Sequence, residues 1–531
     1  MAAVSTEPRI EHLVVLMLEN RSFDHMLGFL PHPGPHFLGL LDEEHHNVAA
    51  SGEVVYATNT GAPGEAAPDH SNCGVLEQLK GYGDVPENGG FVINYASASG
   101  DPAAGKNVMH CLDPLVRCPV LAQLALDFAV CDHWFSSVPG ETWPNRNFAH
   151  AGTSGGTADI EFGFYDDRTI FELLASKGAS WRIYRDGVAQ AWCFRNLWRQ
   201  RDGWLDRRLG RKTLIHNWRE QREFYQDVAS SDLPSYTFIE PAHRSLPGES
   251  RETNSQHPDC NQSSDADFYA GEQLVRNIYQ SLVDNPSLFE RTLLLITYDE
   301  HGGFYDHVAP PAATPPGRPL RRTLSRTITR FLRTLHARLT GKPVPKTCRF
   351  GFDRLGARVP AVLISPWIKP HTVLRTQLEH ASIPATLRAL FDLGPAGLTA
   401  RDTAANTFYH VVQSGLTTPR DLRGSRSTDR GLPPPRRPAP PALDTATTID
   451  SMTPPPDRPR TESKADRQLE DLAARVHKVL HREHPDAAPP AQTHADGGTG
   501  AAEVHAAASV NDEFSAAARA VRERRTADPD R

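Results

Sequence analysis

Two apolar runs that end abruptly in acidic residues constrain the fold of this chain more than any other feature. Residues 13–18 (LVVLML) form an unbroken apolar run that leads directly into Glu19 and Asn20, and residues 292–299 (TLLLITYD) repeat the pattern. A run of this kind indicates a strand buried on both faces of a parallel sheet. Because open α/β sheets place their chemistry at the carboxyl ends of strands, we expect a functional site where these runs end.

Apolar runs and helical patterns alternate over most of the chain. Residues 235–240 (SYTFIE) and 359–365 (VPAVLIS) have the pattern of further buried strands, while 170–178 and 271–285 have the apolar spacing of helices. Strands that alternate with helices predict an α/β fold with a central, mostly parallel sheet. We assign residues 10–415 to one globular domain of this class.

The composition changes after about residue 415. Residues 433–459 are rich in proline, which favours an extended linker, and the Ala-rich end carries short amphipathic patterns. We therefore expect residues 416–531 to form a mostly disordered tail with short helices. The net charge of −7 and the isoelectric point near 6.4 give no case for nucleic acid binding.

A basic insertion interrupts the predicted domain at residues 317–349. It contains no acidic residue, and its apolar residues recur at helical spacing with arginines on the other faces. Such a helix either contacts an anionic membrane surface or packs its apolar stripe on the domain, which is the commoner arrangement. Both interpretations stay open. The stripe consists of Leu320, Leu324, Ile328, Phe331, Leu335 and Leu339.

The seven cysteines are odd in number, scattered along the chain and without a CxxC pair. This distribution argues against a thiolate zinc site and against a disulfide framework. The first residues show neither a basic region nor an apolar leader, and no apolar run reaches membrane-spanning length. We expect a cytoplasmic location, with secretion as the alternative if an N-terminal signal has been removed.

Acidic and amide side chains at two strand ends indicate a metal site. Glu19 and Asn20 follow the first run, and Asp299 and Glu300 stand at the end of the later one. Three carboxylates and one carboxamide at strand ends would repel one another unless a cation held them together. Oxygen ligands suit a hard or borderline divalent ion. The alternative is that Asn20 or Ser22 caps a following helix.

A hydroxyl at a predicted helix start indicates a nucleophile. In GETWPNR, Thr142 precedes Pro144, and proline favours the first turn of a helix. The free N–H groups and the helix dipole at that position stabilise an anion, and a bound divalent cation lowers the pKa of a hydroxyl further. The alternative is ordinary N-capping by Thr142.

Five histidines in polar, turn-rich stretches are candidate site residues. Because the chain has 24 histidines and most must be structural or exposed, each one is weak evidence alone. As a group they are able to protonate a leaving group and to donate hydrogen bonds to phosphate oxygens. They are His70, His257, His301, His307 and His380.

Several motifs, in order along the chain, resemble one known family. The stretches ENRSFDH, GETWPNR, YDEHGGFYDHV and VPAVLISPW, between about residues 10 and 400, are similar to those of the phosphoesterase family of bacterial phospholipases C and the related acid phosphatase. The resemblance implies an alkaline-phosphatase-like three-layer fold for residues 10–415. It also implies a divalent metal ion as cofactor and a phosphate ester as substrate.

The resemblance further implies roles for individual residues. The family holds its metal with a Glu-Asn pair, an Asp-Glu pair and a nucleophilic Ser or Thr, and histidines line its phosphate pocket. Carried over to this chain, the metal ligands are Glu19, Asn20, Thr142, Asp299 and Glu300; the catalytic residues are Thr142, His70 and His257; the substrate-binding residues are His70, His257, His301, His307, His380 and Asn145.

These implications predict a metal-dependent phosphoesterase, similar to phospholipase C, that works through a phosphothreonine intermediate. Glu141 stands where relatives usually have a small or apolar residue, and the tail replaces the C-terminal β-domains of some phospholipases C. A soluble phosphomonoesterase of the acid phosphatase type therefore stays open as an alternative, as does a non-catalytic metal- or phosphate-binding protein. A phospholipid substrate would fit peripheral membrane contact through residues 317–349.

Overall fold

The computed structural model describes most of the predicted domain. The described residues are 10–161, 164–198, 214–243, 253–258, 264–317 and 348–422, with a few positions between 472 and 478. The predictions for the basic insertion (317–349) and for the tail (416–531) fall almost wholly outside these residues. Every candidate site residue lies inside them.

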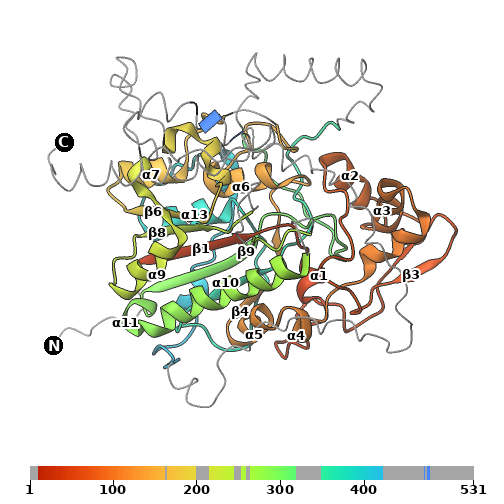
Figure 1. Cartoon of the computed structure of the whole chain (residues 1–531), viewed down its shortest axis with the longest axis horizontal. Helices are drawn as coiled ribbons and strands as arrows, with labels where there is room; N and C mark the ends of the chain where they lie inside the picture. The colour runs from red at the N-terminus through yellow and green to blue at the C-terminus, as the bar shows by residue number, and fades with distance from the viewer. Residues whose placement is uncertain are drawn as a thin grey trace, which may run out of the picture.

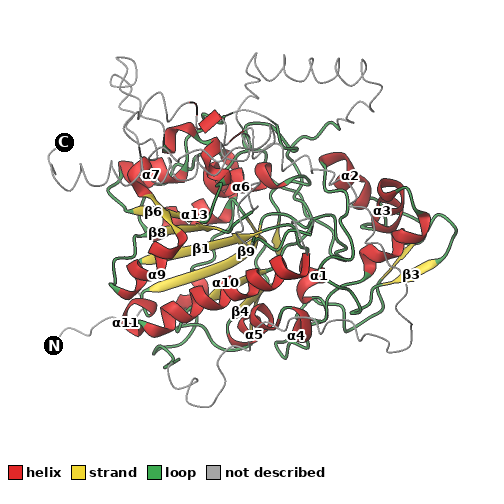
Figure 2. Ribbon diagram, in the orientation of Figure 1, coloured by secondary structure: helices red, strands yellow, loops and turns green. Residues whose placement is uncertain are grey.

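An eight-stranded sheet forms the centre of the described chain, in the order β11-β4-β10-β9-β1-β8-β6-β7 (Figure 2). β10 is antiparallel to its neighbours β9 and β4, and the other pairs are parallel. The predicted α/β fold with a mostly parallel central sheet is confirmed. The strands are β1 (His12–Leu18), β4 (Ala129–Cys131), β6 (Trp181–Arg185), β7 (Trp218–Glu220), β8 (Tyr236–Glu240), β9 (Thr292–Tyr298), β10 (Ala361–Ile364) and β11 (Thr372–Leu374).

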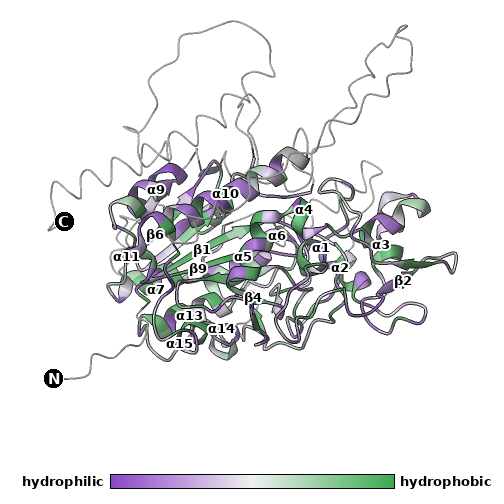
Figure 3. Ribbon diagram, turned by 90° about the horizontal axis from the view of Figure 1, so that it is seen from below, coloured by the Kyte–Doolittle hydropathy of each residue, from purple (hydrophilic) through white to green (hydrophobic). Residues whose placement is uncertain are grey.

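Helices cover both faces of this sheet, which gives three layers. In Figure 3, α9 (Gln221–Ala229) and α10 (Ser264–Asp284) lie on one side of β1 and β9. On the other side lie α7 (Ile170–Ser176), α13 (Ser382–Leu390), α14 (Ala400–Ala404) and α15 (His410–Gln413). The helix α6 (Thr142–Ala151) contacts α7 and α13, while α5 (Pro119–Asp127) and α11 (Pro286–Phe289) contact α10.

The central strand β1 positions the residues of the candidate site. Leu13 to Leu18 are fully buried, and burial of each such side chain contributes about 1.5–3 kcal/mol relative to exposure. β1 pairs along its whole length with β9, and Leu18 lies opposite Tyr298. The residues that follow the two strands therefore leave the sheet side by side.

A smaller lobe follows β1 in the chain and lies at one end of the sheet, at the right of Figure 1. It has an apolar cluster of its own that includes Val75, Phe91 and Tyr305. Its elements are β2 (His46–Val48), β3 (Val54–Tyr56), α2 (Asn72–Gln78), α3 (Phe91–Ser99) and a 3₁₀ helix (Pro102–Met109). The helix α1 (Phe23–Leu27) packs on the main core, and α4 (Pro114–Arg117) contacts α5. Ser22 caps α1, since its Oγ accepts from the amide of His25 at 3.0 Å, as the sequence allowed.

The remaining elements are short and lie between the main ones. Two strands, β5 (Trp134–Phe135) and β12 (Leu378–Glu379), pair with each other in parallel. Three 3₁₀ helices occupy Gln190–Cys193, Arg195–Leu197 and Ile215–Asn217.

One cysteine pair departs from the sequence-based expectation. Cys73 in α2 and Cys348 form a disulfide with their Cα atoms 5.4 Å apart, although the pattern argued against disulfides. The two cysteines are 275 residues apart in the sequence, so no local spacing indicates that they pair. Cys111, Cys118, Cys131 and Cys193 are buried thiols. Within the described residues, none of the helices combines the length and the apolar character that crossing a bilayer requires.

Candidate active site

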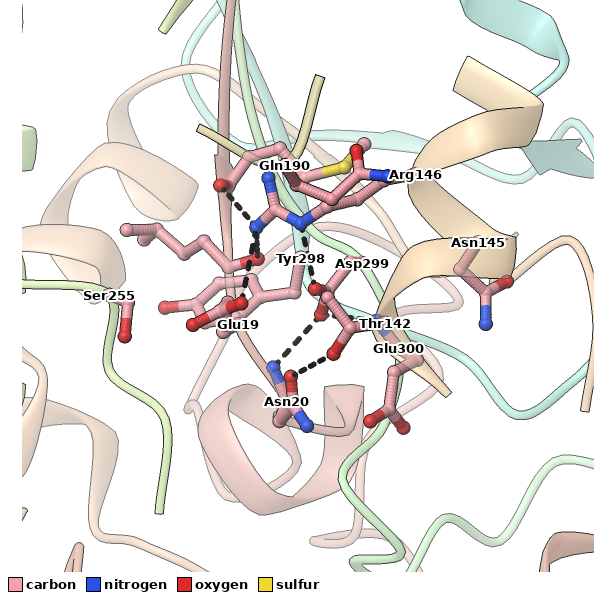
Figure 4. Close-up of polar contacts among 12 residues, drawn as sticks. Glu19, Asn20, Thr142, Asn145, Arg146, Gln190, Ser255, Tyr298, Asp299 and Glu300 are labelled. Atoms are coloured by element: carbon pink, nitrogen blue, oxygen red, sulfur yellow. Dashed lines mark hydrogen bonds and ion pairs between the residues drawn. The ribbon is translucent and has the colours of Figure 1, made fainter. Parts of the chain in front are cut away.

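The two acidic strand ends meet, as the register of β1 and β9 requires. The main-chain N–H of Asn20 donates to Oδ1 of Asp299 at 3.0 Å (Figure 4). Asn20 has a φ of 53°, in the left-handed region, so the backbone turns sharply directly after β1. Gly302 lies directly against this turn, because a Cβ on Gly302 would come within 2.2 Å of the Asn20 carbonyl oxygen. The tight turn after β1 thus depends on a glycine in the loop after β9.

Thr142 is the first residue of α6, and its hydroxyl faces Asn20. Its Oγ1 donates to Oδ1 of Asn20 at 3.2 Å, and the residue is nearly buried (Figure 4). The alternative of N-capping by Thr142 is wrong, since Glu141 occupies the N-cap position. The hydroxyl therefore stands at the positive end of the helix dipole without being used by the helix itself.

Arg146, which sequence reasoning missed, lies between the acids. Its Nε donates to Oδ2 of Asp299 at 3.0 Å, and its Nη2 donates to the carbonyls of Met17 and Leu18 at 3.0 and 3.1 Å. Glu19 Oε1 is 4.0 Å from the same nitrogen. One turn of α6 separates Arg146 from Thr142, so the signal was present in the GETWPNR stretch.

Besides Arg146, a second cation, His243, contacts Glu19. Its Nδ1 lies 2.8 Å from Glu19 Oε1, and its Nε2 lies 2.9 Å from Glu240 Oε2. Carboxylates within ion-pair distance of both ring nitrogens favour the protonated imidazolium. Burial opposes this charge, but Glu19 and Glu240 raise the pKa of His243 to about 9. The signal missed here was that Glu240 also ends a predicted strand.

The carboxylates of the site differ in how far neighbouring cations offset their burial. Burial raises the pKa of Glu19, yet His243 outweighs it and lowers the pKa to about 2. Burial dominates at Asp299 and raises its pKa to about 7 despite Arg146. Glu300 accepts from Gly302 N with Oε2 at 2.7 Å, while its buried Oε1 finds no hydrogen-bond partner among the described residues. Glu19 and Asp299 are therefore each paired with a cation, whereas Glu300 keeps one buried oxygen without a hydrogen-bond partner among the described residues.

Three of the predicted histidines lie beside this group. His257 Nε2 is 3.1 Å from Nδ2 of Asn20, and its ring is 5.9 Å from that of His70. His70 itself bonds through Nδ1 to the carbonyl of Pro68 at 3.1 Å. His301 Nδ1 is 3.4 Å from Glu300 Oε2, and its Nε2 bonds to Gln78. His70 and His257 thus share one edge of the site.

Three other predicted site residues form their contacts with other groups of the protein. His307 contacts Asp24 at 2.6 Å, and His380 contacts the main-chain oxygen of Asp299 at 2.5 Å. Burial lowers the pKa of His380 to about 4. The Asn145 amide bonds to the carbonyls that precede α6, and Figure 4 shows it apart from the acids. These contacts do not bring the three side chains to the Thr142 hydroxyl.

Acidic side chains from two adjacent strand ends thus lie beside a hydroxyl at the start of α6. The model of the Phosphoesterase family matches residues 10–394. The chain therefore belongs to this family and is a phosphoric ester hydrolase of the phospholipase C type.

Relatives of this chain occur in plants and bacteria. Non-specific phospholipase C6 of Arabidopsis thaliana is 36% identical over 426 residues, which cover 77% of this chain and 73% of the relative. Phospholipase C A of Mycobacterium tuberculosis is 28% identical over 432 residues and covers 74% of each chain. Among solved structures, a protein of the alkaline phosphatase superfamily from Vibrio parahaemolyticus is 12% identical, with a TM-score of 0.30 over 78% of this chain and 70% of that chain.

Proposed function

We propose that this protein hydrolyses phosphodiesters with Thr142 as nucleophile and a divalent metal ion as cofactor. The observation that carries the proposal is the position of the Thr142 hydroxyl. It lies at the N-terminus of α6, bonded to Asn20, where the acid pairs after β1 and β9 meet.

The donor set fits a hard divalent cation. The candidate ligands Glu19, Asn20, Thr142, Asp299 and Glu300 all offer oxygen. Glu300 Oε1 is buried without a partner among the described residues, as expected for a ligand atom. Within the described ranges, no group of three or more His, Cys, Asp or Glu side chains is arranged to hold a metal ion. The proposed ligand set therefore rests on the chemistry of its donors, and it includes the amide of Asn20 and the hydroxyl of Thr142.

The charges of the site support the same ion. Two cations, Arg146 and His243, face Glu19, Glu240 and Asp299, and Glu300 adds a fourth carboxylate. With all four acids ionised, two negative charges remain uncompensated in a buried site. A divalent cation would balance them, and burial of such charges without a partner is strongly unfavourable.

The chain supplies most parts of the proposed reaction. A bound divalent ion would neutralise phosphate charge and lower the pKa of the Thr142 hydroxyl. Thr142 Oγ1 loses its proton to solvent and forms a bond to phosphorus as the bond to the leaving alcohol oxygen breaks, and the N-terminus of α6 favours the negative charge there. His70 or His257 donates a proton to that oxygen, so the alcohol leaves. Water then attacks phosphorus, the bond to Thr142 Oγ1 breaks, and the phosphomonoester leaves; a proton from the water restores the threonine hydroxyl.

We propose a phospholipid as the substrate. The support is that the relatives at 36% and 28% identity are named phospholipases C. A soluble phosphomonoester remains the alternative. Membrane contact through residues 317–349 and the cellular location stay predictions, since the first concerns residues outside the described ranges.

A substrate panel run with Mn²⁺, Zn²⁺, Ca²⁺ and Mg²⁺ tests the proposal. We expect turnover of phosphatidylcholine vesicles and of bis(p-nitrophenyl) phosphate to exceed that of p-nitrophenyl phosphate, and to stop on chelation. Thr142→Ala should lose at least about 1,000-fold in kcat, whereas Thr142→Ser should keep measurable activity. Undiminished activity of Thr142→Ala would exclude Thr142 as nucleophile, and activity in excess chelator would exclude the metal.

A further inference from the structure

His380 and Trp134 form a buried pair behind Asp299. Trp134 begins β5, and His380 directly follows β12. Because β5 and β12 pair in parallel with Leu378 opposite Trp134, the backbone holds the two rings together. Both side chains are fully buried.

The indole of Trp134 fixes the tautomer of His380. Trp134 Nε1 lies 3.3 Å from His380 Nδ1 and donates to it. An indole N–H only donates, so Nδ1 must carry a lone pair. The ring proton is then on Nε2, which lies 2.5 Å from the main-chain oxygen of Asp299 and donates to it. His380 is therefore a neutral donor already committed to a carbonyl oxygen, rather than a ligand for phosphate.

The hydrogen bond from His380 to the Asp299 carbonyl orients both Asp299 and Glu300. The Asp299 oxygen belongs to the peptide unit that joins Asp299 to Glu300, and a peptide unit is planar. The N–H of the same unit donates to Asp299 Oδ1 at 2.7 Å. β9 ends at Tyr298, so the strand ladder no longer orients this unit. Loss of the imidazole donor would let the unit rotate, and both carboxylates would move with it.

We propose that His380 is a positioning residue that fixes the Asp299–Glu300 peptide, and that Trp134 selects the tautomer this requires. The inference rests on the proposed function, in which Asp299 and Glu300 serve the reaction. It replaces the substrate contact that the sequence predicted for His380. Partners one layer behind metal ligands typically change affinity or activity by about 10- to 100-fold when they are removed.

Four variants test the proposal. His380→Leu removes the donor, His380→Gln keeps an N–H donor of similar reach, and Trp134→Phe frees the imidazole to adopt either tautomer. His12→Leu is the matched control, because His12 Nδ1 contacts the carbonyl of Pro234 at 3.0 Å at the start of β1, the opposite end from the site. The readouts are kcat and KM for bis(p-nitrophenyl) phosphate, the Mn²⁺ dissociation constant, and crystal structures of the two His380 variants.

We expect His380→Leu to lower kcat and weaken Mn²⁺ binding by about 10- to 100-fold with little change in KM. His380→Gln should recover most of both, Trp134→Phe should lose less in the same direction, and His12→Leu should match the wild type. A raised KM with unchanged kcat and Mn²⁺ affinity, or a Gln variant as impaired as the Leu variant, would overturn the proposal.

The test separates this inference from the proposed function. If the wild type turns over no phosphoester, the proposed function fails, while the position of the Asp299 carbonyl in the two variant structures still decides the role of His380. An unmoved Asp299–Glu300 peptide in His380→Leu overturns the inference. If that variant does not fold, the Gln and Phe variants decide it through Mn²⁺ affinity.

Discussion

Arg146 connects the end of β1 to Asp299, the residue that follows β9. Its Nε donates to Oδ2 of Asp299 at 3.0 Å, while its Nη2 donates to the last carbonyls of β1. One guanidinium thus connects α6, β1 and β9. A rigid fork of donors suits this task, whereas a lysine offers one compact charge on a flexible stem.

Replacement of Arg146 should be strongly destabilising. Arg146→Met leaves Asp299 buried without its cation, and breaking such a pair costs about 3–5 kcal/mol. Arg146→Lys keeps the charge but not the fork, so its loss should be smaller. Arg291→Met is the control: Arg291 and Glu11 form a partly exposed ion pair, where the effect should stay below about 1 kcal/mol. Urea unfolding at pH 7.5 measures all three, and equal losses for Arg146→Met and Arg291→Met would contradict the assignment.

Asn145 should affect the rate rather than substrate binding. Its Nδ2 donates to the carbonyls of Val138 and Gly140, and its Oδ1 accepts from Val138 N at 3.0 Å. The side chain thereby shapes the loop that leads into Thr142. Asn145→Ala should lower kcat by about 10- to 100-fold with little change in KM, because misplaced reacting groups slow the chemical step.

Asn145→Asp is the matched variant for this prediction. A carboxylate of the same size still accepts from Val138 but repels the two carbonyls, so it should be no better than alanine. Steady-state kinetics with bis(p-nitrophenyl) phosphate decides the question. A raised KM with unchanged kcat in either variant would instead favour the substrate contact that the sequence predicted.

The disulfide between Cys73 and Cys348 should contribute measurably to stability. Removal of a native disulfide typically costs about 2–5 kcal/mol. We expect the Tm of the wild type to fall in dithiothreitol, and the double variant Cys73→Ser/Cys348→Ser to have a low Tm that the reductant leaves unchanged. Equal Tm values for the wild type with and without dithiothreitol would show that the bond does not form in solution.

The strand-end acids could be predicted because the pattern and the physics agree. An apolar run such as 13–18 leaves little choice but a buried strand, and parallel strands place Glu19 and Asp299 at the same edge. The pairing of β1 with β9 itself could not be predicted, since it depends on which strands the crossover helices bring together. Short strands with mixed composition, such as β6 (WRIYR), give no such signal.

The cations of the site were missed for a different reason. The sequence argument assigned the balancing charge to a metal ion alone, so Arg146 and His243 were not considered. Both become visible only when the fold places them against Glu19 and Asp299. The burial of His380 could not be predicted either, because it lies in a polar stretch of the sequence, whereas the fold buries it directly after β12.

A buried glutamate in α10, Glu272, should make the stability of the protein depend on pH. Glu272 is fully buried, and its Oε2 accepts from the amides of Val120 and Leu121 at 2.7 and 3.4 Å, at the start of α5. Burial raises the pKa of Glu272 to about 8, although these two N–H groups oppose the shift. The folded protein therefore keeps a proton on Glu272 at a pH where the unfolded chain has lost it.

Glu272→Gln should be more stable than the wild type at pH 8, and the difference should shrink toward pH 5. Between the unfolded pKa of 4.5 and the folded value of about 8, the folded state binds more protons. The wild-type free energy of unfolding therefore falls by up to about 1.4 kcal/mol per pH unit through this group, and glutamine removes that loss while its carbonyl still accepts from α5. Guanidinium unfolding at pH 5, 6, 7 and 8 measures the difference, with exposed Glu77→Gln as control. A difference between wild type and Glu272→Gln that stays constant across this range would show that Glu272 is ionised in the folded protein.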